Sequence, residues 1–382
     1  MVATAANTTA ARTMVAAMIS PRRYIQGRGV LSLAGEQIAP LGNSALLIAD
    51  NTVWQVAGHT VENHLRAANI QARGVSFQGE CSENEINRIC EIGRDASVNV
   101  VVGIGGGKTL DAAKAVGYRL GVNWAIIATL ASTDAPTSAL SVIYTDEGVF
   151  EKYAFYPKNP DLVLVDTEVI AQAPVRFLSA GIGDALSTWI EARANLESRK
   201  PAMSGGIATM AAAQLARLCW DTLFTYGITA IKAVEQKAVT QAVEKIVEAN
   251  TLLSGLGFES AGLAAAHAIH NGLTTLHEQT HSIMHGEKVA FGALSQLMME
   301  GRPTDEVLEF IEYCIQVNLP TTLADLNLAD VSREDLLRVA ERACAPGETI
   351  HNMPFPVTPE MTLDAMVAAD AVARDYKAKR EG

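Results

Sequence analysis

The sequence is short of cysteine and of basic side chains, and each shortage excludes a class of protein. Its 382 residues include 5 cysteines, none in CxxC spacing, which argues against a disulfide scaffold or a cysteine zinc site and indicates free thiols in a reducing cytoplasm. Lys and Arg number 30 against 42 Asp and Glu, and the net charge of −12 argues against nucleic-acid binding and attachment to anionic lipid. The longest uncharged runs contain polar residues, so no membrane span is predicted.

The hydrophobic pattern divides the chain into two domains. From residue 21 to 176, short runs rich in Val and Ile alternate with amphipathic stretches, which predicts an α/β domain built on a mostly parallel sheet. Residues 177–382 have helical spacing, as in Val234–Leu253, which predicts an all-α domain. Residues 1–20 lack the apolar core of a signal peptide, and we expect a disordered leader. The strand-like runs are Ala45–Ala49, Ala72–Phe77, Val98–Ile104, Trp124–Ala128, Ala139–Tyr144 and Leu162–Val165.

A glycine-rich turn follows one of the strand-like runs. It consists of Gly105, Gly106 and Gly107, with Lys108 next. Backbone N–H groups at the start of a helix bind anions, and glycine lets a pyrophosphate approach closely. The spacing matches neither a Walker A loop nor the GxGxxG pattern, so the turn predicts a phosphate site that is not specific to ATP. A tight turn without a ligand is the alternative.

Asp50 directly follows the run Ala45–Ala49. A carboxylate in this place can accept hydrogen bonds from an adenosine ribose and would repel the additional phosphate of NADP, which favours NAD. A helix cap is an equally good interpretation of this residue.

Histidines gather in the second half of the chain. Five of the 8 lie close together: His267, His270, His277, His281 and His285. Imidazole is the commonest metal ligand. On one straight helix His267 and His285 would lie roughly 27 Å apart, so they can share an ion only if the chain reverses between them, for example at Gly272. His281 and His285, four residues apart, could share an ion from one helix, and periodicity alone slightly favours this pair.

Two further stretches carry carboxylates. Asp184 follows two glycines at the expected start of a helix near the domain boundary, where it could bind a metal ion or cap the helix. Asp134 lies in the hydroxyl-rich stretch Thr129–Ser138, which follows a strand-like run at the end of the sheet where α/β proteins bind ligands. The hydroxyls and the carboxylate suit a polyhydroxylated substrate or a nicotinamide amide.

Four motifs occur in the order and spacing of one family. They are the GGGxxxD turn ending at Asp111, the STDAP segment Ser132–Pro136, the GxGDA segment Gly181–Ala185 and the HGEKVAFG segment His285–Gly292. Together they make the chain, from about Tyr24 onward, resemble the iron-containing alcohol dehydrogenase family, and within it the members that oxidise glycerol. The resemblance implies an α/β nucleotide-binding domain, a helical domain and an active site in the cleft between them.

The resemblance also implies roles for individual residues. The metal ligands would be Asp184, His267 and His285, and not His281. Other branches have a fourth ligand, a histidine, at the position of Thr188, so the resemblance favours Zn²⁺ over Fe²⁺, although these ligand types also suit Fe²⁺. Asp134 would hold a substrate hydroxyl. The residues implied near NAD are Asp50, Gly105, Gly106, Gly107, Lys108, Thr129, Ser132, Ser138, Leu140 and Tyr144.

The implied activity is the NAD-dependent, metal-assisted oxidation of glycerol and related 1,2-diols to dihydroxyacetone. The implied assembly is a homo-oligomer, for which the resemblance suggests an octamer. His270 and His281 are candidates for a supporting or proton-relay role. A polyol-phosphate dehydrogenase or a dehydroquinate-synthase-like lyase is an alternative, disfavoured because Gly262–Gly286 contains no Lys or Arg. A non-catalytic metal- or nucleotide-binding protein is the alternative from another class.

Overall fold

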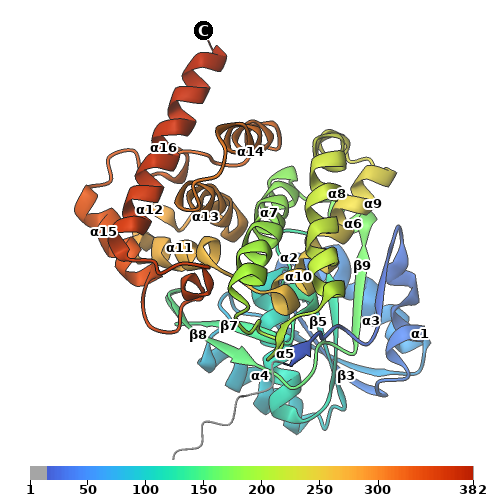
Figure 1. Ribbon diagram of the computed structural model, residues 1–382. Coiled ribbons are helices and arrows are strands. Elements are labelled where there is room, and N and C mark those ends of the chain that lie inside the picture. The colour runs from blue at the N-terminus through green and yellow to red at the C-terminus, as the bar shows by residue number, and fades with distance from the viewer. Residues whose placement is uncertain (1–14, 382) are drawn as a thin grey trace, which may run out of the picture.

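A six-stranded parallel sheet forms the centre of the N-terminal half (Figure 1). The structure, a computed structural model, describes residues 15–381. The strand order is β2-β9-β6-β5-β3-β4, and all neighbours are parallel, which confirms the predicted α/β class. The strands are β2 (Tyr24–Gly27), β3 (Ser44–Ala49), β4 (Gln71–Ser76), β5 (Val100–Gly105), β6 (Asn123–Ala128) and β9 (Leu162–Asp166).

Helices cover both faces of this sheet, so its inner strands are apolar on both sides. Val101 of β5 belongs to one apolar core, whereas its neighbours Val100 and Val102 belong to a second core on the other face. This is why β5 appears in the sequence as a continuous apolar run. The helical segments of this half are Val30–Leu33, α1 (Ala34–Ile38), α2 (Asn51–Val53), Trp54–Gly58, α3 (His59–Ala67), α4 (Glu83–Asp95), α5 (Gly107–Leu120), Ala135–Thr137 and α6 (Thr167–Gln172).

The run expected as a strand at Ala139–Tyr144 does not join the parallel sheet. Its strand, β7 (Leu140–Tyr144), pairs antiparallel with β8 (Phe150–Phe155), which the sequence pattern did not reveal. Only a short turn separates the two strands, and a parallel connection needs a crossover of a dozen or more residues. The turn closes with a 2.8 Å hydrogen bond from the Thr145 N–H to the Val149 carbonyl.

The second half is almost entirely helical, as predicted. The helix α7 begins directly after Pro174, and α16 projects from the body of the molecule toward the C-terminus (Figure 1). The helices are α7 (Val175–Ser198), α8 (Met210–Glu235), α9 (Gln241–Glu248), α10 (Ser254–Ala261), α11 (Ala265–Leu273), α12 (His277–Thr280), α13 (His285–Met299), α14 (Thr304–Gln316), α15 (Arg333–Ala343) and α16 (Pro359–Glu381), with shorter helical turns at Ala249–Leu253, Thr274–Leu276, Ala324–Leu326 and Thr349–Asn352.

The stretch expected as one helix at Val234–Leu253 is two helices. The first, α8, ends at Glu235. Lys237 then adopts a left-handed conformation with φ of 57°, and a right-handed helix cannot continue through such a residue. Thr240 begins α9 because its hydroxyl accepts a hydrogen bond from the Val243 N–H. A left-handed residue therefore ends one helix, and a polar cap begins the next, inside this apolar-periodic stretch.

Part of the expected disordered leader has regular structure. Ala16–Ala17 (β1) forms a short parallel ladder with Ile207–Ala208 (β10), and the Ile19 N–H donates to the Ser260 hydroxyl at 3.2 Å. Partners so distant in the sequence could not be foreseen from a short Ala-rich segment. Residues 1–14 of the expected leader lie outside the described residues.

Across residues 15–381, no single helix has both the length and the apolar character needed to cross a membrane. The segments Gln241–Ala261 and Ala265–Thr280 meet that test only as a pair, bent by 104°.

Candidate active site

Glycines on α7 bring Asp184 to the centre of the candidate site. The sequence suggested that Asp184 lies at the start of a helix, where it could act as a cap. In the structure it lies well inside α7, which begins at Val175, so it is not a helix cap. A side chain at Gly181 would place a Cβ 1.8 Å from the carbonyl oxygen of Ala131, and one at Gly183 would place it 2.4 Å from that of Gly286. The glycines therefore let α7 pack against the loop after β6 and the first turn of α13.

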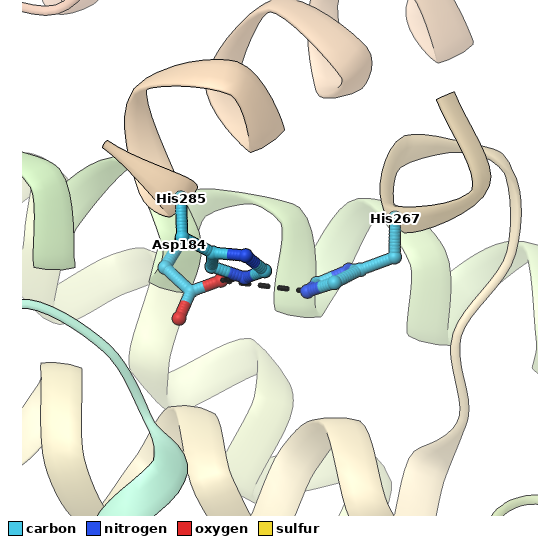
Figure 2. Close-up of side chains that lie close together, drawn as sticks. All are labelled: Asp184, His267 and His285. Atoms are coloured by element: carbon cyan, nitrogen blue, oxygen red, sulfur yellow. Dashed lines mark ion pairs between the residues drawn. The ribbon is translucent and has the colours of Figure 1, made fainter. Parts of the chain in front are cut away.

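Two histidines meet Asp184 from different helices. His267 lies on α11, and His285 is the first residue of α13. The chain reverses between them through Thr274–Leu276 and α12. The Nε2 atoms of His267 and His285 lie 3.4 and 3.2 Å from Asp184 Oδ1, and Figure 2 shows the three side chains facing one another. Their ligand atoms lie within 4.8 Å of one another, and no other group of three such residues in the described chain could hold an ion.

Hydrogen bonds leave the ring atoms that face Asp184 available as ligands. His267 Nδ1 lies 2.6 Å from Glu191 Oε2, and His285 Nδ1 lies 3.0 Å from His270 Nε2. Asp184 Oδ1 is buried without a hydrogen-bond donor among the described residues. A buried carboxylate oxygen with two imidazole nitrogens beside it is the donor set of a His₂-carboxylate metal site, so the residues present fit a divalent ion.

The charges of the site favour a cation. Burial opposes ionisation of Asp184, but the imidazoles of His285 and His267 outweigh it and lower the pKa of this carboxyl. Burial also lowers the pKa of His267, but the carboxylates of Glu191 and Asp184 outweigh it and raise that pKa overall. Two carboxylates therefore hold positive charge between them.

Asp134 lies beside the ligands, in the wall of the cavity. Burial and the nearby Asp184 carboxylate raise the pKa of Asp134. The Ser254 hydroxyl donates to Asp134 Oδ2 at 2.7 Å, and the Asp134 N–H donates to Asp184 Oδ2 at 3.2 Å. These two bonds fix Asp134 relative to the ligand group.

One cavity of about 540 Å³ lies between the two halves of the chain and contains most of the expected site residues. Gly105 and Thr129 do not line it. Instead, the Thr129 N–H donates to the Gly105 carbonyl at 3.1 Å at the end of the sheet. Asp184 is buried and does not line the cavity either, although its two histidine neighbours do. The expected residues that line the cavity are Asp50, Gly106, Gly107, Lys108, Ser132, Asp134, Ser138, Leu140, Tyr144, His267 and His285.

The glycine turn faces this cavity at the start of α5. Gly105 has a φ of 150°, which disfavours other residues, and α5 begins at Gly107 without a side-chain cap. Its first N–H groups can therefore bind an anion. Lys108 pairs with Glu80. Asp50 caps α2 by accepting from two backbone N–H groups at 2.8 and 2.9 Å, so the cap interpretation is correct, and the same residue lines the cavity.

Sequence reasoning missed several residues that support the site. Glu191 follows Asp184 by seven positions, two helical turns, and this spacing could have revealed it. Lys288 lines the cavity, and burial together with Lys108 lowers its pKa to about 8. Of the two additional histidines, His270 contacts a ligand, whereas His281 bonds the Glu278 carbonyl at 2.9 Å and contacts none of the three.

Comparisons with known proteins identify the family. A family model described as iron-containing alcohol dehydrogenase matches residues 21–167. A glycerol dehydrogenase from Citrobacter freundii is 51% identical over 366 residues, which are 96% of this chain and 100% of that protein. The chain belongs to the iron-containing alcohol dehydrogenase family.

Two other known proteins are similar to this chain over nearly the same length. A glycolaldehyde reductase from Halobacterium salinarum is 48% identical over 94% of this chain and 99% of its own. The crystal structure of glycerol dehydrogenase from Schizosaccharomyces pombe superposes with a TM-score of 0.94 at 40% identity, and the match covers 97% of this chain and 94% of that one. The parallel sheet followed by a helical half is therefore the fold of this family.

Proposed function

We propose that this family member is a glycerol dehydrogenase, which oxidises glycerol and related 1,2-diols with NAD and a divalent metal ion. One observation carries the proposal: Asp184, His267 and His285 converge on one side of a cavity whose other side is the uncapped start of α5. The 51% identity to the glycerol dehydrogenase from Citrobacter freundii, over its full length, supports the substrate.

The residues around the glycine turn would hold NAD, which accepts the hydride. Backbone N–H groups of Gly106, Gly107 and Lys108 would bind the pyrophosphate at the start of α5. Asp50 would bind the adenosine ribose and repel the phosphate of NADP. The remaining residues proposed near NAD are Gly105, Thr129 and Ser132, with Ser138, Leu140 and Tyr144 on the nicotinamide side.

Asp184, His267 and His285 would hold the metal ion, which lowers the pKa of a coordinated substrate hydroxyl. Asp134 would orient a second hydroxyl, because it lines the cavity and its carboxylate is held by the Ser254 hydroxyl. A substrate with two adjacent hydroxyls can bind the metal ion with one hydroxyl and Asp134 with the other, which favours vicinal diols over simple alcohols.

The surroundings of Thr188 support Zn²⁺ over Fe²⁺. Thr188 is buried, and its hydroxyl lies 2.8 Å from that of Ser254, so it is occupied away from the three ligands. Three protein ligands with an open position are typical of catalytic zinc sites.

We also propose that the protein is cytoplasmic and forms a homo-oligomer. The five cysteines are free thiols, four of them buried, which supports a reducing cytoplasm. Met210 and Leu218 on α8 are exposed apolar side chains, and a second copy of the chain would cover them. They support a homo-oligomer, and the family suggests that this oligomer is an octamer.

Measuring NADH formation from NAD and glycerol tests the function. The rate should vanish after the metal is removed with a chelator and return when Zn²⁺ is added back, more fully than with Fe²⁺. Inactivity of the metal-replete enzyme with glycerol, combined with activity on a polyol phosphate, would favour the phosphorylated-substrate alternative. Metal binding without reduction of NAD by any diol would favour the non-catalytic alternative.

A further inference from the structure

The two proposed histidine ligands are supported in different ways. His267 Nδ1 contacts a carboxylate oxygen of Glu191, which can only accept a hydrogen bond, so this ring must carry its proton on Nδ1. His285 Nδ1 contacts another imidazole, His270 Nε2. Because either ring nitrogen of a neutral imidazole can be donor or acceptor, His270 alone does not determine which nitrogen of His285 carries the proton.

A row of side chains continues from His270 to a charged pair. His270 Nδ1 lies 3.1 Å from Asn271 Oδ1, and the Asn271 amide nitrogen donates to Glu348 Oε2 at 2.9 Å. The other oxygen of Glu348 accepts from Arg342. His270 and Asn271 are buried, and both line the cavity beside the proposed metal ligands.

The charged end of this row sets the direction of every hydrogen bond in it. Glu348, ion-paired with Arg342, can only accept, so Asn271 must turn its NH₂ group to Glu348 and its carbonyl oxygen to His270. That oxygen only accepts, so His270 Nδ1 must be the donor. A neutral His270 is then left with an unprotonated Nε2.

The tautomer of His270 in turn determines the tautomer of His285. An unprotonated Nε2 on His270 must accept from His285, so His285 carries its proton on Nδ1. Its Nε2, which lies 3.2 Å from Asp184 Oδ1, is left with a free lone pair. Only in this tautomer can His285 coordinate a metal ion through the nitrogen that faces Asp184.

We propose that Glu348, Asn271 and His270 form a relay that fixes the tautomer of His285 for metal binding. The relay does through three side chains what Glu191 does for His267 directly. It rests on the proposed metal site, and its members are positioning residues that do not touch the ion. His267 and His270 lie one turn apart on α11, so a single helix supplies one ligand and supports the other.

Zinc affinity of the full-length protein, measured by competition with a chromophoric chelator, tests the relay. His270→Phe removes the acceptor for His285 and should weaken zinc binding by about 10-fold or more. His270→Gln should keep affinity near that of the wild type, because its side-chain oxygen can accept from His285 Nδ1. His281→Ala is the matched control and should leave the affinity unchanged, because His281 lines the same cavity without contacting a ligand.

A pair of variants at Glu348 tests the far end of the relay if His270→Phe does not fold, as judged by circular dichroism. Glu348→Leu removes the group that orients Asn271 and should weaken zinc binding, whereas Glu348→Gln still offers an accepting oxygen and should weaken it less. Equal affinities for His270→Phe and His270→Gln, equal affinities for Glu348→Leu and Glu348→Gln, or wild-type affinity in a folded His270→Phe would overturn the relay. A wild-type protein that binds no divalent metal would instead overturn the proposed function.

Discussion

The two walls of the cavity are built on different principles. The wall proposed to bind NAD is local: β5, its glycine turn and α5 are consecutive in the sequence, and the groups offered are mainly backbone N–H groups. The wall with the metal ligands is assembled from α7, α11 and α13, and the groups offered are side chains. Backbone groups survive most substitutions, whereas each ligand side chain is irreplaceable. The two walls should therefore respond very differently to mutation.

Removing a metal ligand should have the largest effect. Asp184→Ala, His267→Ala or His285→Ala should lower the turnover number by about 10³-fold or more, because the ion contributes several kcal/mol to the reaction. NAD should still bind, since it contacts the other wall. Initial rates of NADH formation and calorimetric titration with NAD measure the two effects. Normal turnover in a His267→Ala enzyme of known metal content would contradict the site.

Glu259 joins the two halves of the chain and should make their stability depend on pH. Its carboxylate, on α10, accepts from the Ala139 N–H and the Asn159 amide, both at 2.6 Å. Burial raises the pKa of Glu259 from 4.5 to about 7. The folded state therefore binds the proton more tightly, and the resulting stability is complete below pH 4.5 and is lost as the pH rises through 7.

Urea unfolding of the wild type and of Glu259→Gln measures this effect. Between pH 5 and pH 8 the free energy of unfolding of the wild type should fall relative to that of the variant by about 2–3 kcal/mol. A difference between the two proteins that does not change with pH would show that Glu259 does not titrate in this range.

Weakening the support of one ligand should have a smaller effect than removing the ligand. Glu191→Gln should lower zinc affinity by about 10-fold to 100-fold, because the amide is a weaker acceptor for His267 Nδ1 than the carboxylate. At saturating zinc much of the turnover should return. Chelator competition and a zinc titration of activity measure both effects, and zinc affinity equal to that of the wild type would leave Glu191 without this role.

The smallest effect is expected on the NAD wall, at Asp50. Asp50→Ser keeps a good helix cap for α2 but removes the negative charge. The ratio of kcat/KM for NADP to that for NAD should rise by about tenfold, equivalent to about 1.4 kcal/mol, while the metal content stays normal. An unchanged ratio would mean that Asp50 only caps the helix.

Local features were predictable because their causes are local. The apolar runs of β3, β5, β6 and β9, the glycine turn and the change to helical spacing after Pro174 all follow from neighbouring residues. One prediction failed because contacts between distant segments decide the structure: β1 pairs with β10. Two others failed on local structure, because the short turn that pairs β7 with β8 was not recognised and because Asp184 lies inside a helix and not at its start. In the sequence, the glycines beside Asp184 suggested the start of a helix. In the structure they lie within α7 and allow it to pack closely against neighbouring backbone.

By itself the sequence determined that this chain has an α/β half with an anion-binding turn, a helical half and a cluster of histidines able to bind metal. Periodicity and glycine spacing carry that information, because they reflect the geometry of single helices, strands and turns. Only the tertiary structure decided among the histidines. Their residue pattern slightly favoured His281 with His285, whereas the reversal between α11 and α13 brings His267 to Asp184 and leaves His281 apart. Metal ligation needs atoms within a few ångströms of one another, and packing of helices distant in the sequence controls that distance.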